Sequence, residues 1–222
     1  TFVDQYQLKN KRVLDVGAGR GYLQDMVEDY TGLDISPTAA RYFHKPFVLG
    51  SATAMPFSDG EFDAIWSIWV LEHILNPESA LREMRRVLKP GGVMLLFPAW
   101  FCTSWAAEGY EVRPYRALDW QGRVVKATIP LRSSRLFRAL YVYPIRVIRL
   151  AASRTQAGPA SFHYRRLKPN YERYWVPDSD AVNSMDPYEA ILWFASRGDR
   201  CLNCRDHGLR TIVRPPLALI IQ

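Results

Sequence analysis

The 222-residue sequence has no apolar run near the roughly 20 residues that a membrane-spanning helix needs, and no signal peptide opens it. Internal repeats and low-complexity tracts are also absent. Cysteine is scarce, and three residues, an odd number, favour a reducing compartment over a disulfide framework. The first residue is Thr and not Met, which suggests a processed or trimmed chain and leaves open whether a segment precedes it. We expect a cytoplasmic globular protein.

Composition fits one α/β domain with a substantial core, since 48% of the residues are hydrophobic and 13% aromatic. The net charge of +7 is uneven along the chain. Residues 104–175 hold 14 Arg and Lys against four Asp and Glu, which leaves a net charge of −3 for the remainder. The excess positive charge therefore belongs to one segment.

Three glycines at alternate positions follow an apolar run in VLDVGAGRGYL, residues 13–23. Glycine in a strand-to-helix turn supplies positive φ or lets a ligand approach the backbone, and N–H groups at a helix N-terminus bind polar or anionic groups. Gly21 comes one residue earlier than in the dinucleotide fingerprint, and Tyr22 stands where that fingerprint has glycine. The pattern D-x-G-x-G-x-G therefore disfavours a dehydrogenase.

Further segments follow in a regular order. We expect a short helix over about 21–29, a strand that ends at Asp34 in TGLDIS, a helix in SPTAARYFHK and a strand in FVLG. GSATAMPF comes next, and then a fourth strand with its exit in FDAIWSIWVLEHI. NPESALREMRRVLKPGG predicts a helix with Asn76 as N-cap and Pro90 to Gly92 as the stop, and VMLLFPAW predicts a fifth strand.

In order and spacing, residues 12–100 resemble the class I S-adenosylmethionine (SAM) dependent methyltransferases, with type 11-like motifs. The resemblance implies a doubly wound α/β fold, Rossmann-like, with a seven-stranded, mostly parallel sheet. DPYEAILWFASRG predicts a helix capped by Asp186, while RCLNC and PLALIIQ predict the last two strands, the final one antiparallel. We expect a single domain over 1–222, with a SAM-binding core (1–103), a basic helical insertion or lid after the fifth strand (104–175) and a segment that completes the sheet (176–222).

The resemblance also implies a cofactor site for SAM. The glycines would let the backbone approach the methionine and ribose portion, Asp15 would lie near the cofactor's ammonium, and Asp34 would bind the ribose hydroxyls. Ser51 stands where the family usually has an aspartate, and its hydroxyl can accept from the adenine amino group without charge assistance. The implied cofactor-binding residues are Asp15, Gly17, Gly19, Gly21, Asp34, Ile35, Ser51, Ala52 and Ser67.

The candidate catalytic base is His73, at a position where many relatives carry histidine; a purely structural hydrogen bond is the alternative. His163, Asp178 and Asp180 are further candidates near the acceptor, although solvent exposure, caps and turns also explain them. CLNCRDH supplies Cys201, Cys204 and His207 at a ligand-like spacing. A zinc site needs four ligands and the only other cysteine is Cys102, so no metal is expected and the cysteines are interpreted as small buried apolar residues.

The segment LRSSRLFRALYVYPIRVIRLAAS, residues 131–153, predicts an arginine-rich amphipathic helix, or two helices broken by Pro144. One face carries Arg132, Arg135, Arg138, Arg146 and Arg149, and another carries Leu136, Leu140, Tyr143 and Val147. Three interpretations stay open: a lid that packs its apolar face on the domain, a helix at an anionic membrane surface, and a nucleic-acid contact.

The sequence therefore predicts a SAM-dependent methyltransferase. Its acceptor would be a small or lipid-linked molecule methylated on oxygen or carbon, and the protein would be cytoplasmic or peripherally membrane-associated. An RNA methyltransferase and a non-catalytic SAM-binding protein are the alternatives. The acceptor and the oligomeric state cannot be determined from sequence, because fold-level resemblance carries only the cofactor half of the reaction.

Overall fold

The computed structural model describes residues 1–171, 174, 176–204 and 209–222. It divides into two compact units. The first contains Thr1–Pro98, Asp199–Asn203 and Leu217–Gln222, and the second contains Ala99–Gly198 and Cys204–Pro216. Within the described part of the chain, no helix combines the length and the apolar character that a bilayer crossing requires.

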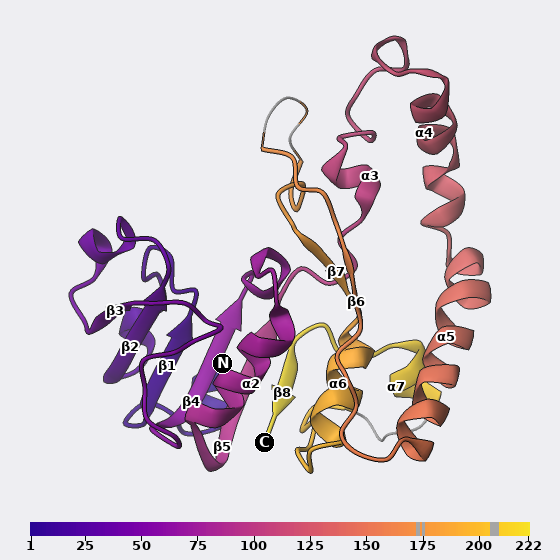
Figure 1. The fold of residues 1–222 in the computed structure, drawn as a ribbon. Helices are drawn as coiled ribbons and strands as arrows, with labels where there is room; N and C mark the ends of the chain where they lie inside the picture. Colours follow the sequence, from indigo (N-terminus) through magenta and orange to yellow (C-terminus); the bar gives the residue numbers. More distant parts are fainter. Residues whose placement is uncertain (172–173, 175, 205–208) are drawn as a thin grey trace. The chain divides into compact units, whose positions relative to one another are not determined.

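A six-stranded sheet forms the first unit, with the order β3-β2-β1-β4-β5-β8 (Figure 1). Neighbouring strands are parallel except β5 and β8, which are antiparallel. The strand order reverses between β1 and β4, and in such sheets the crevice at this reversal is where ligands bind. The strands are β1 (Arg12–Val16), β2 (Asp29–Asp34), β3 (Phe47–Leu49), β4 (Phe62–Ile68), β5 (Leu88–Phe97) and β8 (Leu219–Ile221).

The prediction of a Rossmann-like, mostly parallel sheet with an antiparallel last strand is confirmed, but the count of seven strands is not. Cys201 makes only an isolated bridge to Ile221, so RCLNC forms no strand among its described residues. Of the segment 176–222 that was expected to complete the sheet, only 199–203 and 217–222 belong to the first unit.

One face of the sheet is packed by short elements. The expected helices over 21–29 and in SPTAARYFHK are only 3₁₀ turns, at η1 (Gln24–Met26) and η2 (Ala39–Tyr42). Strand β2 already begins at Asp29, so only a short connection follows Gly21, and 3₁₀ turns are frequent in such connectors. The core on this side contains Val13, Tyr30, Ala64, Trp66 and Val93, together with Val3 and Leu8 near the short helix α1 (Phe2–Gln5).

Helix α2 (Pro77–Val87) begins as predicted, since the Asn76 side chain accepts from the backbone N–H of Ser79 and Pro77 occupies its first turn. It ends at Val87, before the predicted stop, because Leu88 already pairs with Phe62 at the start of β5. A further 3₁₀ turn, η3 (Leu71–His73), joins β4 to this helix.

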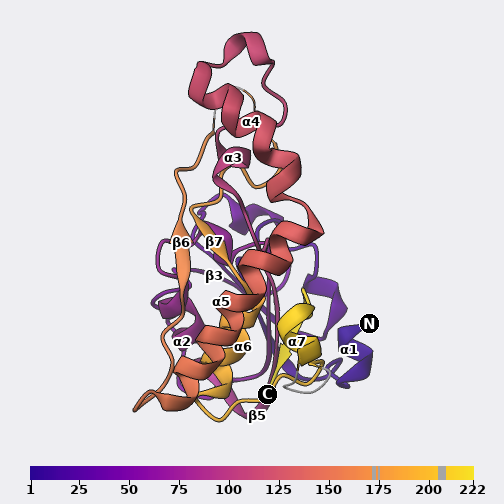
Figure 2. The same cartoon turned by 90° about the vertical axis from the view of Figure 1, so that its right-hand side faces the viewer.

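The second unit is mainly helical and carries a two-stranded antiparallel ribbon of β6 (Tyr164–Arg166) and β7 (Asn183–Met185). In Figure 2, α5 follows α4 along the chain and runs beside α6. The described helices are α3 (Ser104–Ala107), η4 (Tyr115–Ala117), α4 (Trp120–Arg132), α5 (Arg135–Thr155), α6 (Pro187–Ala195) and α7 (Leu209–Val213). Helix α6 is capped by Asp186 as predicted, but it belongs to this unit and not to the sheet's own unit.

Helix α5 continues through Pro144 without a break, so the alternative of two helices is wrong. Arg146 is buried, and its guanidinium pairs with Asp186 at 2.8 Å, while Arg149 pairs with Glu189 at 3.0 Å. Leu136 and Leu140, which would pack on the domain only if the helix were a lid, are 67% and 72% exposed. Two carboxylates on α6 and its cap therefore decide which side of α5 turns inward.

Cys201 and Cys204 are disulfide-bonded, which corrects the expectation of reduced, merely apolar cysteines. Only two residues separate them, so a tight loop suffices to bring the sulfurs together. Cys102 is a free, buried thiol. His207, the third residue of the ligand-like pattern, lies outside the described residues.

Candidate functional site

A pocket of about 520 Å³ lies in the first unit, where β1, β2, β3 and β4 end. This volume is within the range of about 300–1,000 Å³ that small-molecule sites occupy. The loops after the four strands supply its walls. The lining residues are Gly17, Leu33, Asp34, Ile35, Gly50, Ser51, Ala52, Thr53, Trp69, Val70, His73, Ile74, Leu75 and Asn76.

The loop after β1 requires glycine at Gly17, where φ is +76°. A Cβ built on Gly17 would lie 2.2 Å from the Cγ2 atom of Val70, so a side chain has no room there. The backbone N–H groups of Gly17 and Ala18 donate to the carbonyl of Leu33, at 2.8 and 3.0 Å. These two bonds fix the loop against the end of β2.

Asp34 joins the glycine loop to the end of β2. Its carboxylate accepts from the backbone N–H of Gly19 through one oxygen and from that of Ser36 through the other, both at 2.8 Å. A carboxylate has about four lone-pair sites, so two remain for a ligand. An oriented acceptor of this kind, on the wall of a pocket, suits a vicinal diol.

Asp15 does not line the pocket but lies buried behind it, at 5% exposure. The Tyr30 hydroxyl donates to its carboxylate at 2.7 Å. Burial raises the pKa of Asp15 to about 6, opposed in part by the Trp66 and Tyr30 side chains. Burial of the Tyr30 hydroxyl, together with the neighbouring Asp15 carboxylate, in turn raises the pKa of that hydroxyl.

The segment from Gly50 to Thr53, after β3, forms the wall next to Asp34, since the backbone N–H of Gly50 donates to the Asp34 carbonyl at 2.9 Å. The hydroxyls of Ser51 and Thr53 lie 2.8 Å apart, and Ser51 Oγ also accepts from the backbone N–H of Thr53 at 3.2 Å. Arg86 on α2 holds the chain that follows, because its guanidinium donates to the carbonyls of Met55 and Phe57. The wall is thereby tied to the body of the unit.

The chain leaving β4 closes the pocket with residues that the sequence analysis did not single out. Trp69 is 65% exposed and has φ of +56°, a conformation uncommon outside glycine and concentrated at functional sites. Val70, Ile74 and Leu75 add apolar surface beside it. Apolar residues directly after a strand's end, in WVLEHIL, were the signal that could have identified them.

The predicted site residues divide into those that the pocket gathers and those that it does not. It gathers Gly17, Asp34, Ile35, Ser51, Ala52 and His73. Gly19 and Gly21 belong to the loop after β1 and Asp15 is buried in that strand, and none of the three lines the pocket. Ser67 is 1% exposed, and its Oγ has no hydrogen-bond partner among the residues described.

His73 is the pocket's titratable side chain beside Asp34. Its side chain is 40% exposed, and Nε2 lies 3.9 Å from an oxygen of the buried Glu72. The other candidates lie elsewhere: His163 contacts Arg149 and Glu189 in the second unit, and Asp178 and Asp180 lie in a turn that lines neither pocket. The disulfide removes Cys201 and Cys204 as thiolate ligands.

Comparison with known proteins matches residues 14–96 to the family described as "Methyltransferase domain". The demethylmenaquinone methyltransferase of Renibacterium salmoninarum is 38% identical over 95 residues, which cover 39% of this chain and 40% of that protein. The sterol 4-C-methyltransferase strm-1 of Caenorhabditis elegans is 31% identical over 104 residues, covering 40% and 31%. The chain thus spans less than half the length of these relatives.

Among solved structures, the YcgJ protein of Bacillus subtilis is similar over 41% of this chain and 45% of its own, with 29% identity and a TM-score of 0.39. The family match over residues 14–96 includes the glycine loop, the strand that ends at Asp34 and every residue that lines the pocket of the first unit.

Proposed function

We propose that the chain, whose residues 14–96 match the methyltransferase domain family, is a class I SAM-dependent methyltransferase that transfers the methyl group of SAM to an oxygen or carbon atom of a small-molecule or lipid-linked acceptor. The observation that carries the proposal is the pocket that Asp34 lines together with the segment from Gly50 to Thr53. The relatives support carbon as one methylated atom, since one of them is named for the 4-C position of a sterol.

The residues of the pocket fit SAM chemically. The two remaining lone-pair sites of Asp34 would accept the ribose hydroxyls, and the side chain of Ile35, 76% exposed, would pack against the adenine. Ser51 and Ala52 would border the same ring. Gly17, which lines the pocket, would lie beside the methionine portion.

The buried carboxylate of Asp15 would supply negative charge toward the cationic end of the cofactor. A nearby positive charge favours the ionised form of a carboxyl, so the pKa of Asp15 is expected to fall from about 6 on binding. Ser67, whose buried hydroxyl has no partner among the described residues, would approach the methionine moiety from the end of β4.

SAM supplies an electrophilic methyl group, so the protein has to align the acceptor atom at about 3–3.5 Å and exclude water. Trp69 and Leu75 provide the apolar, exposed surface next to the cofactor pocket. His73 would take the proton from a hydroxyl acceptor. Replacing His73 with asparagine should then flatten the lower limb of the pH profile of kcat, whereas a structural role would leave the shape of that profile unchanged.

A lipid-linked acceptor is favoured by the outer face of α5. Leu136, Leu140, Val147 and Ile148, which we call the apolar stripe, are 67%, 72%, 48% and 65% exposed. Exposed arginines at 135 and 138 lie beside it. Apolar side chains flanked by cations are typical of a helix at an anionic membrane surface.

Flotation with anionic vesicles tests this surface. The wild type should float with the vesicles. The variant Leu140→Asp/Ile148→Asp places two charges in the apolar stripe and should not float. Gln121→Asp/Thr155→Asp adds the same charge at exposed polar positions and should float as the wild type does. Failure of the wild type to float, or equal losses in both variants, would remove the membrane surface from the proposal and leave a soluble acceptor.

Methyl transfer itself is tested with methyl-labelled SAM and three acceptor pools: a lipid extract, soluble metabolites and RNA. Label in either of the first two pools supports the proposal. Label in RNA alone would favour the RNA methyltransferase, because the basic segment also suits phosphates. Tight SAM binding with no label in any pool would favour a non-catalytic SAM-binding protein.

A further inference from the structure

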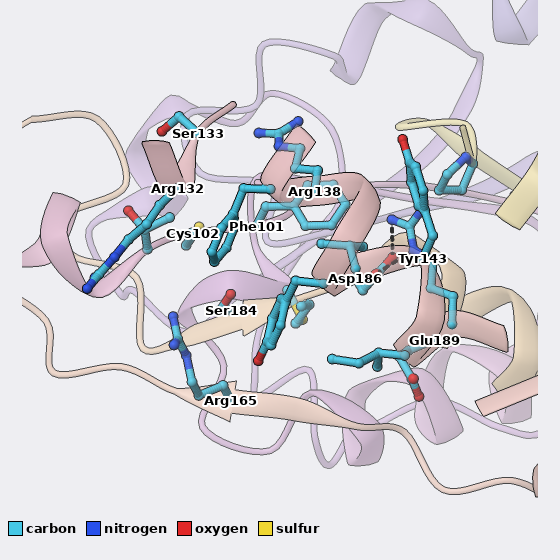
Figure 3. Close-up of a pocket in the computed structure, with 18 of the residues that line it drawn as sticks. Phe101, Cys102, Arg132, Ser133, Arg138, Tyr143, Arg165, Ser184, Asp186 and Glu189 are labelled. Carbon is cyan, nitrogen blue, oxygen red and sulfur yellow. Dashed lines mark hydrogen bonds and ion pairs between the residues drawn. The ribbon is translucent and has the colours of Figure 1, made fainter. Parts of the chain in front are cut away.

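The second unit contains a larger cavity of its own, about 1140 Å³ (Figure 3). The end of α4, the first half of α5, the β6–β7 ribbon and the segment from Phe101 to Trp105 supply its lining. The volume exceeds the usual 300–1,000 Å³ of small-molecule sites, so it accommodates an extended organic ligand. No role in the proposed methyl transfer accounts for it.

Charge in this cavity is unbalanced. Two of its three carboxylates are already paired, Asp186 with Arg146 and Glu189 with Arg149, which leaves Glu111. Four further arginines line the cavity and form no ion pair with any residue that the structure describes: Arg132, Arg138, Arg165 and Arg214. Their positive charge exceeds the remaining negative charge by several units.

These arginines come from separate elements. Arg132 ends α4, Arg138 lies on α5 and Arg165 on β6, and Figure 3 shows all three around the same cavity. Arg132 also lies 5.8 Å from the ring of Trp105. Helices α4 and α5 and strand β6 thus place arginines around the same cavity. The sequence spacing of these arginines does not reveal this arrangement.

Aromatic side chains also line the cavity. The rings of Phe137 and Tyr141 are stacked with centroids 5.8 Å apart, and Phe101 and Tyr143 also contribute. Rings and arginine planes together bind ligands with an apolar or aromatic body and an anionic end.

We propose that this cavity binds an organic phosphate, with the phosphate held by Arg138 and Arg165 and the apolar body lying against the rings. The guanidinium fork matches phosphate oxygens in bidentate fashion. A phosphate monoester carries nearly two negative charges at neutral pH and compensates the excess of arginines better than the single charge of a carboxylate. The site goes beyond the proposed methyl transfer and does not depend on it, since binding is measured without SAM.

Isothermal titration of the full chain with octyl phosphate tests the proposal, with inorganic phosphate and octanoate as comparisons. Octyl phosphate should bind at least tenfold more tightly than either, because only it offers both the dianion and the apolar body. Its affinity should fall as salt is raised. Equal affinity for octanoate, or no binding of octyl phosphate, would overturn the proposal.

The variant Arg138→Gln/Arg165→Gln should weaken octyl phosphate binding at least tenfold. Arg135→Gln is the matched control, because Arg135 lies on the same helix, is exposed and does not line the cavity. Unchanged circular dichroism and thermal unfolding would show that the variants fold. A loss in the control equal to that in the double variant would also contradict the site.

Flotation with vesicles that contain phosphatidic acid distinguishes two sources of the same chemistry. If the double variant floats much less than Arg135→Gln, the phosphate belongs to a lipid headgroup. If both float equally while octyl phosphate binding still differs, the ligand is a free organic phosphate. If neither measurement distinguishes the variants, the two arginines do not form the site.

Discussion

Replacing Asp15 with asparagine is expected to stabilise the unliganded protein at neutral pH. The carboxyl is 5% exposed, and burial raises its pKa from 3.8 to about 6. At pH 7 the Asp15 carboxyl is therefore ionised in the folded protein, although burial favours its protonated form. The difference between the two pKa values corresponds to about 3 kcal/mol, and we expect a gain of about 1–3 kcal/mol, because the bond from Tyr30 loses its charged acceptor.

The pH dependence gives this prediction its sign. Below pH 3.8 the carboxyl is protonated in the folded and unfolded states, so its ionisation contributes nothing to stability. Between 3.8 and about 6 only the folded state keeps the proton, so the free energy of unfolding falls as pH rises. Above about 6 the loss is complete. The advantage of Asp15→Asn over wild type should therefore grow from pH 4 to pH 6.5 and then stay constant.

Urea unfolding followed by circular dichroism between pH 4 and pH 8 measures this advantage. The same variant should bind SAM more weakly, since the proposed negative charge near the cofactor is gone. Tyr30→Phe serves as the control: it keeps the carboxyl, removes its donor and should destabilise the protein at pH 7. An advantage that does not change with pH, or an asparagine variant less stable than wild type at pH 7.5, would contradict the prediction.

Three further changes test the packing. Gly17→Ala should lower the free energy of unfolding by at least about 2 kcal/mol, because the new Cβ would lie 2.2 Å from Val70 and φ is +76°. Thermal unfolding measures this loss, and a variant as stable as the wild type would contradict the close approach. Arg146→Leu should cost about 3 kcal/mol by leaving the Asp186 carboxylate unpaired, and adding Asp186→Asn should recover part of this in urea unfolding. Asn76→Ala should cost about 1 kcal/mol as the N-cap of α2 is lost, whereas Asn76→Ser should be nearly neutral in the same assay.

The turns and helix caps that depend on neighbouring residues were predicted correctly from the sequence. The turn at Gly17, the cap at Asn76 and the cap at Asp186 all lie where the residue types indicate, because each depends on neighbours a few positions away. The gathering of Asp34 and Ser51 in one pocket was also predictable, since both follow parallel strands whose carboxyl ends meet at the same edge.

The orientation of α5 and the burial of Asp15 were not predicted, because both depend on residues far away in the sequence. The orientation of α5 depends on ion pairs from Arg146 to Asp186 and from Arg149 to Glu189, each across 40 residues of chain. Helical periodicity shows that two faces exist but not which one meets a partner. The buried position of Asp15 likewise depends on Tyr30, on a neighbouring strand.

The seven-strand expectation failed for a related reason. RCLNC has the composition of an edge strand, but Cys201 makes a single bridge and is disulfide-bonded. The segment does form backbone hydrogen bonds between Arg200 and Gln222 and from Leu202 to Ile220, but this pairing amounts to the isolated bridge and not to a strand. Composition does not specify how far such pairing extends.

Isothermal titration of SAM into wild type and into Asp34→Ala tests the central claim, that the pocket beside Asp34 binds this cofactor. We predict saturable binding of SAM by the wild type, no comparable binding of NAD, and at least a tenfold loss of SAM affinity in the variant, because the oriented carboxylate is gone. The variant's circular dichroism should match that of the wild type. Unchanged SAM affinity in a folded Asp34→Ala, or tighter binding of NAD than of SAM by the wild type, would contradict the account.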